Sequence, residues 1–171
     1  AYALNTASRE LLRSVRAWPE ADPQDTRVPP ITPVSAMQVW GDDGGELQFS
    51  ADDQGADALT WIVDVPALEQ RLAHAVHFQA GITCLEEAPS HAPLTVVCEG
   101  KASRSRDEFG IDFDVSPYPQ RAIATRLSCQ HPHHHAARQW FEPGSILGVL
   151  PMGAPAEGAD SGNSVAIVWS V

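Results

Sequence analysis

Short apolar segments separated by turn residues are the feature that most limits the folds open to this chain. Residues 37–40 (Met-Gln-Val-Trp) and 47–49 (Leu-Gln-Phe) alternate apolar and polar side chains, as half-buried strands do. Residues 41–45, Gly-Asp-Asp-Gly-Gly, supply turn chemistry between them, so the pair predicts a β-hairpin. Further strands are predicted at residues 59–63, 94–98, 122–129, 146–150 and 165–171. The predicted class is α+β with a mainly antiparallel sheet.

Two stretches have the apolar spacing of amphipathic helices. The first covers residues 7–17, and the second begins near Val65 and runs to Val76. Pro66 falls in the first turn of the second helix, where its missing N–H costs little. Short helices are also predicted at residues 102–109 and 136–141, and the proline-rich residues 19–33 predict a loop.

The charge balance argues against nucleic acid as a partner. The 171-residue chain has 22 acidic and 11 basic residues, a formal net charge of -11, and no local cluster of Lys and Arg. Such a chain offers no basic face to phosphates, and it would be repelled by an anionic membrane surface. No apolar run approaches the ~20 residues that a transmembrane helix needs, so no transmembrane segment is predicted.

The cysteines bear on the cellular location of the protein, and the first residues bear on whether the chain is part of a longer protein. Cys84, Cys98 and Cys129 are widely spaced and odd in number, which fits neither a disulfide framework nor a zinc pattern. A cytoplasmic location is therefore predicted. The chain begins Ala-Tyr-Ala-Leu, without an initiator Met or a charged and then apolar leader, so we expect an internal fragment of a longer protein.

The strand-to-turn segment at residues 94–106 carries the most chemical information. The predicted strand is followed by Glu-Gly-Lys-Ala-Ser-Arg-Ser-Arg, residues 99–106, and then by a helix. Such a turn lets a ligand approach bare backbone at Gly100, while the helix offers unpaired N–H groups to an anion. The same residues also fit a capped turn with solvated charges, and both interpretations stay open on this pattern.

The histidine-rich residues 131–135, His-Pro-His-His-His, invite a metal assignment because imidazole binds transition metals. Adjacent histidines beside a proline rarely converge on one ion, and no carboxylate or thiol within the run completes a ligand shell. We therefore predict a polar surface loop and no metal site.

Other catalytic patterns are missing from the sequence. Neither Gly144-Ser145 nor Ser161-Gly162 has the GxSxG frame of a hydrolase. The glycines of residues 41–45 fit neither of the phosphate-binding loop patterns GxGxxG and GxxxxGK. The acidic residues Asp112, Asp114, Glu86 and Glu87 are interpreted as surface charges.

Several ordered stretches together resemble the FAD-dependent aromatic-ring monooxygenases, most closely the ubiquinone-biosynthesis (polyprenyl-methoxyphenol) hydroxylase branch. Residues 3–5 leading into the helix at Ser8 resemble the segment after the family's first flavin-binding βαβ unit, and residues 61–64 with Leu68 and Leu72 resemble its next strand and helix. Glu99 to Arg106 resembles the DGxxSxxR motif. Similarity to the pattern of the substrate-domain sheet, "A…F…g…lLPl…siVWS", is found in residues 136–141, 147–151 and 164–170.

The resemblance implies a cofactor role for one turn. Glu99 and Gly100 would lie beside FAD, with Ser103 and Arg106 supporting the turn. Glu99 stands where the family has Asp and is one methylene longer, so the resemblance does not specify how its carboxylate would contact FAD. Residues 35–63 and 115–171 would form the substrate-binding sheet, and residues 1–18 and 64–112 would belong to the FAD-binding domain side. The family's GxGxxG and GD motifs would fall before residue 1 and after residue 171, so the fragment alone is expected to be inactive and to bind flavin weakly or not at all.

The implied reaction is hydroxylation of a hydrophobic phenol or quinone precursor by a flavin hydroperoxide formed with NAD(P)H and O₂. In such enzymes the protein mainly orients the substrate and excludes water, so no catalytic residue is named. Peripheral membrane association of the full protein and a homodimer formed through uncovered strand edges are compatible with this assignment. Two alternatives stay open: another flavin oxidoreductase, including one acting on a different aromatic acid, and a non-catalytic module that binds a lipid, a quinone or a partner protein.

Overall fold

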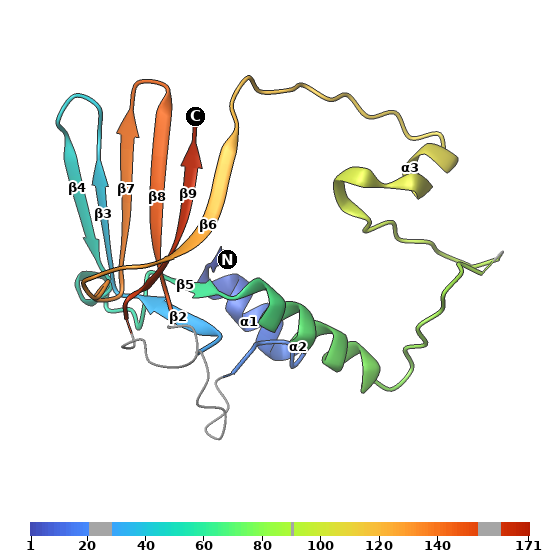
Figure 1. Cartoon of the computed structure of the whole chain (residues 1–171). Coiled ribbons are helices and arrows are strands. Elements are labelled where there is room, and N and C mark those ends of the chain that lie inside the picture. Colours follow the sequence, from blue (N-terminus) through green and yellow to red (C-terminus); the bar gives the residue numbers. More distant parts are fainter. Residues whose placement is uncertain (21–28, 90, 154–161) are drawn as a thin grey trace. The chain divides into compact units, whose positions relative to one another are not determined.

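The structure is a computed structural model that describes residues 1–20, 29–89, 91–153 and 162–171. The chain forms two compact units, one made of Ala1–Ala80 with Gln120–Val171 and the other of Gly81–Pro119 (Figure 1). Helices and mostly antiparallel sheets occur together, which confirms the predicted α+β class.

A six-stranded sheet dominates the first unit, with the strand order β4-β3-β7-β8-β9-β6. Neighbouring strands are antiparallel except for β3 and β7, which are parallel. Figure 1 shows the β3–β4 and β7–β8 hairpins side by side, and the predicted hairpin at residues 37–49 is thereby confirmed. The strands are β3 Ala36–Trp40, β4 Glu46–Ser50, β6 Ala122–Ser128, β7 Ala136–Glu142, β8 Ser145–Met152 and β9 Ser164–Ser170.

A second, three-stranded antiparallel sheet has the order β1-β5-β2, formed by Tyr2–Leu4, Thr60–Val63 and Ile31–Val34. The strand predicted at residues 59–63 exists as β5, but it pairs here rather than with the β3–β4 hairpin. Within the predicted loop of residues 19–33, Ile31–Val34 is the strand β2, and residues 21–28 lie outside the described residues.

Two helices accompany the smaller sheet: α1, Thr6–Ser14, and α2, Val65–His77. Both predicted amphipathic helices are thus confirmed. Asn5 caps α1 because its Oδ1 accepts a hydrogen bond from the Ser8 N–H at 2.9 Å. Pro66 lies in the first turn of α2, as its sequence position predicts.

Strand β5 buries side chains on both of its faces. Trp61 and Val63 join a core that includes Leu68 of α2. Ile62 packs in a second core with Val34 and Ala137. This two-sided burial explains the unbroken apolar sequence of the strand. The first core contains Trp18, Ala58, Trp61, Val63 and Leu68, and the second Val34, Ile62, Ala137, Met152 and Ala166.

The helix predicted at residues 136–141 is wrong, because this segment is strand β7. It pairs with β3 on one side and with β8 on the other. Ala, Arg and Gln favour a helix locally, but pairing with two strands overrides that preference. Alternate residues of β7 consequently point to opposite faces of the sheet.

The buried strand predicted at residues 94–98 is also wrong. Leu94 and Val96 are 78% and 71% exposed, and these residues form no strand. A strand needs a neighbour for its backbone groups, and the described part of the second unit has only η2, Gly100–Ala102, and α3, Arg104–Glu108, as regular elements. The short helix predicted at residues 102–109 is confirmed as α3.

Candidate functional site

The four residues predicted to contact a cofactor lie together in the turn that precedes α3. Gly100 has a φ of 74°, in the left-handed region that glycine adopts without strain. Ser103 is buried, and its Oγ accepts a hydrogen bond from the Arg106 N–H at 3.2 Å, so it caps the helix.

Glu99 binds the start of α3 with its own carboxylate. It accepts hydrogen bonds from Ser103 Oγ at 2.6 Å, from Ser105 Oγ at 2.7 Å and from the Ser105 N–H at 3.1 Å. These bonds, that from the Ser103 hydroxyl first, lower the pKa of Glu99 to about 2. The carboxylate thus occupies the end of the helix at which the sequence predicts an external anion.

Arg106 closes the turn from the other side. Its Nη2 donates a hydrogen bond to the Lys101 carbonyl at 3.0 Å, and its guanidinium lies 4.0 Å from the ring centroid of Phe113. At Gly100, apart from the residue itself and its two chain neighbours, no atom of the described residues lies within 4 Å of the position that a Cβ would take. The structure therefore shows a capped turn whose backbone is open at one glycine, and a flavin contact there stays a prediction.

The histidine segment is a structural junction. His133 is only 5% exposed, so the predicted polar surface loop is wrong for this residue. Its Nδ1 accepts a hydrogen bond from the His135 N–H at 2.9 Å, which leaves Nε2 to donate to the Met152 carbonyl at 3.0 Å. Burial lowers the pKa of His133. Among the described residues, no group of three or more His, Cys, Asp or Glu side chains is placed to hold a metal ion.

Strand register sets one side chain from each strand of the large sheet in a single row. Trp40 and Trp140 stack within this row, with ring centroids 4.9 Å apart and planes 7° apart. Trp169 and Ile123 are 43% and 49% exposed, so apolar surface of the row faces outward. We call this set the aromatic row; in spatial order it is Glu46, Trp40, Trp140, Leu147, Trp169 and Ile123.

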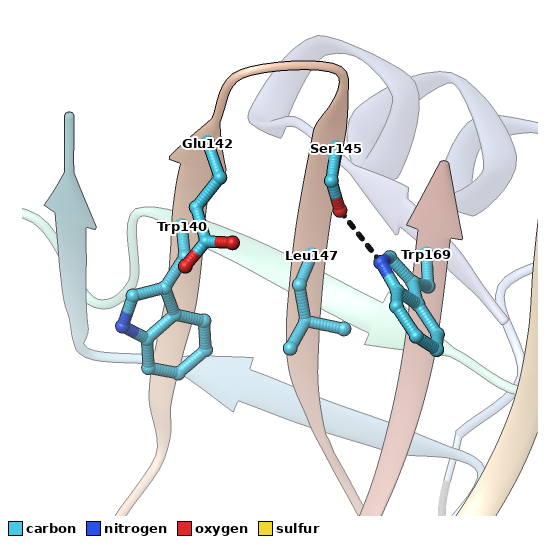
Figure 2. A pocket seen from close by; sticks show the side chains of 5 residues that line it. All are labelled: Trp140, Glu142, Ser145, Leu147 and Trp169. Atoms are coloured by element: carbon cyan, nitrogen blue, oxygen red, sulfur yellow. Dashed lines mark hydrogen bonds between the residues drawn. The ribbon is translucent and has the colours of Figure 1, made fainter. Parts of the chain in front are cut away.

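A hollow of about 330 Å³ opens over the middle of the aromatic row. Figure 2 shows Leu147 between Trp140 and Trp169, with Glu142 and Ser145 towards the end of the β7–β8 hairpin. Trp169 Nε1 donates a hydrogen bond to Ser145 Oγ at 2.7 Å, which fixes that indole. The hollow thus combines apolar walls with one carboxylate and one hydroxyl, as small-molecule sites commonly do.

Sequence reasoning missed the hollow. The interpretation of residues 136–141 as a helix removed Trp140 from the sheet, so its alignment with Trp169 could not be foreseen. The only local signal for a strand in this segment is the pair Trp140 and Phe141, because aromatic residues are enriched in strands.

Comparison of the sequence with models of known protein families gives no match. In the described ranges, no helix combines the length and the apolar character that crossing a membrane requires. The fold, the Glu99 turn and the hollow are therefore the observations on which a functional proposal rests.

Proposed function

We propose that this chain is the substrate-side part of a flavin-dependent monooxygenase that hydroxylates a hydrophobic phenol or quinone precursor with FAD, NAD(P)H and O₂. The observation that carries the proposal is the hollow on the antiparallel sheet, with Trp140, Leu147 and Trp169 as its apolar lining. Aromatic and aliphatic walls with few polar groups suit an aromatic ring. The resemblance of the ordered sequence stretches supports the same assignment.

The side chains of the hollow would bind and orient the ring. They project from neighbouring strands of one sheet, and strands hold such positions more rigidly than loops do. FAD, when bound, would activate O₂ for the reaction. The Glu99 turn fits that cofactor in part: Gly100 leaves its backbone open to close approach, but the Ser105 N–H is already bound by Glu99.

The proposed setting is cytoplasmic, in keeping with Cys84, Cys98 and Cys129, all of which are unpaired. A hydrophobic substrate would bring the full-length protein into peripheral contact with a membrane. Homodimer formation through the outer strands β4 and β6 belongs to the same proposal, since exposed strand edges pair readily.

The test is purification of the full-length gene product, with its visible spectrum and FAD content recorded. A yellow protein that oxidises NAD(P)H in the presence of a phenol and releases a hydroxylated ring is the expected result. A colourless protein that takes up no FAD on reconstitution would reject the proposal. Turnover of NAD(P)H without ring hydroxylation would point to another flavin oxidoreductase.

A non-catalytic binding module is the second candidate, and the Glu99 carboxylate favours it. Because Glu99 already binds the Ser103 and Ser105 hydroxyls and the Ser105 N–H, the turn is satisfied without an external phosphate. The hollow could still bind a quinone or another aromatic molecule. A flavin-free full-length protein that binds such a ligand would support this candidate.

A further inference from the structure

We infer that Glu142 is a specificity-determining residue of the hollow, selecting an aromatic ring that carries a hydroxyl donor and excluding rings that carry a carboxylate. The inference narrows the substrate class of the proposed function and rests on it for the reaction. The binding itself involves only side chains of this chain, so it can be measured without flavin.

The space over Leu147 accommodates one substituted ring. Trp140 and Trp169 stand on β7 and β9, with Leu147 on β8 between them. Neighbouring strands are about 4.8 Å apart, so the two tryptophans arise from strands about 10 Å apart. The volume of about 330 Å³ is roughly twice that of a ~150 Å³ cavity that holds benzene. One ring with a short substituent therefore fits.

The polar end of the hollow offers one acceptor and one donor. Glu142 and Ser145 are direct register partners across the hairpin. The Ser145 hydroxyl accepts the indole N–H of Trp169 and keeps its own hydrogen to donate. A carboxylate only accepts hydrogen bonds, so a ring hydroxyl placed here would donate to Glu142 and accept from Ser145.

The charge of Glu142 is not neutralised locally. Among the described residues, no basic side chain forms an ion pair with it. Arg138, on the same strand, lies four positions away, about 13 Å along β7, and donates to Gln38 at 3.0 Å. Glu142 is exposed, so a second carboxylate brought into contact with it would meet a like charge across a partly solvated gap; at about 4 Å that repulsion is still about 1 kcal/mol or more. Neutral hydroxyl ligands do not carry this cost.

The experiment is isothermal titration calorimetry of the 171-residue protein with 4-ethylphenol and 4-ethylbenzoate at neutral pH. We expect 4-ethylphenol to bind at least about tenfold more tightly, a ratio that corresponds to about 1.4 kcal/mol. Glu142→Gln should reduce this preference to about threefold or less. Leu147→Phe, which fills the floor of the hollow, should weaken the binding of both ligands.

Glu46→Gln is the matched control. Glu46 is the outermost member of the same aromatic row, but it does not line the hollow and accepts a hydrogen bond from Gln48 Nε2 at 2.7 Å. This substitution removes the same charge from the same face of the sheet, so it should leave the ligand preference unchanged. Near-UV circular dichroism of each variant establishes that the fold is retained.

Several results would overturn the inference. One is a preference for 4-ethylphenol that persists in Glu142→Gln. Another is a reduction of this preference in Glu46→Gln as large as that in Glu142→Gln. Unchanged affinity in folded Leu147→Phe, or no binding at all, would also contradict it. Because flavin content is measured separately on the full-length protein, a flavin-free protein with Glu142-dependent binding would reject the proposed function alone. A flavoprotein without that dependence would reject this inference alone.

Discussion

Trp169 donates its indole N–H to the Ser145 hydroxyl at 2.7 Å, and this bond fixes one wall of the hollow. Ser145→Ala removes the acceptor. We expect a loss of about 0.5–1.5 kcal/mol in the free energy of unfolding and weaker binding of aromatic ligands, because the indole loses its fixed orientation. Urea unfolding and ligand titration measure the two effects. Ser170→Ala, one residue beyond Trp169 on β9 and on the opposite face, should leave ligand affinity unchanged.

The Glu99 turn yields a prediction about acid. Hydrogen bonds from Ser103 and Ser105 lower the pKa of Glu99 from 4.5 to about 2. Because the folded value is depressed, the stabilisation is fully present above pH 4.5 and is lost as the pH falls towards 2. Ser103→Ala should raise the pKa of Glu99 towards its ordinary value. Carboxyl ¹³C NMR titration measures it, and an unchanged value would show that the bond has no influence in solution.

The segments that could be predicted from the sequence are those whose pairing partners lie nearby in the chain. The β3–β4 hairpin and the helices α1 and α2 follow from turn residues and periodicity within each segment. Strand β7 does not, because its partner β3 lies about a hundred residues earlier in the chain and its own sequence favours a helix. Residues 94–98 show the reverse error, since an apolar run without a partner strand stays exposed.

The same distinction applies to the candidate sites. Glu99, Ser103 and Arg106 lie within a single turn and its helix, so their grouping could be predicted from spacing. Trp140 and Trp169 lie on either side of Leu147 only because of the register of three strands. The direction of the Glu99 carboxylate, towards its own helix, also depends on backbone geometry that the pattern of residues does not specify.

The buried His133 predicts a loss of stability on mild acidification. Its Nδ1 accepts a hydrogen bond from the His135 N–H, so a proton on Nδ1 would break that bond. His134, His135 and Arg138 add repulsion to the charged form, and burial is the largest cause of the lowered pKa. Since the folded value is depressed, stability should be full above pH 6.5 and should decline as the pH falls below it.

Substitution of His133 tests whether this residue causes the loss of stability on mild acidification. His133→Asn should cost about 1–3 kcal/mol at neutral pH, because a buried hydrogen-bonded group is lost, and should flatten the decline in stability below pH 6.5. Urea unfolding at several pH values gives both quantities. His131→Asn is the control, because His131 is exposed in the same segment. An equal flattening in both variants would show that His133 is not the responsible group.

The ion pair between Arg126 of β6 and Asp64 predicts a specific coupling in the first unit. Asp64 precedes α2 and its side chain is only 19% exposed, whereas that of Arg126 is 48% exposed. Arg126→Met leaves a largely buried carboxylate unpaired, so we expect a loss of about 1–2 kcal/mol in unfolding free energy. Arg126→Met combined with Asp64→Asn should cost less than the sum of the single changes. Arg121→Met removes an exposed positive charge just before β6 and should have little effect. Additive single and double variants would show that the pair contributes no coupling energy.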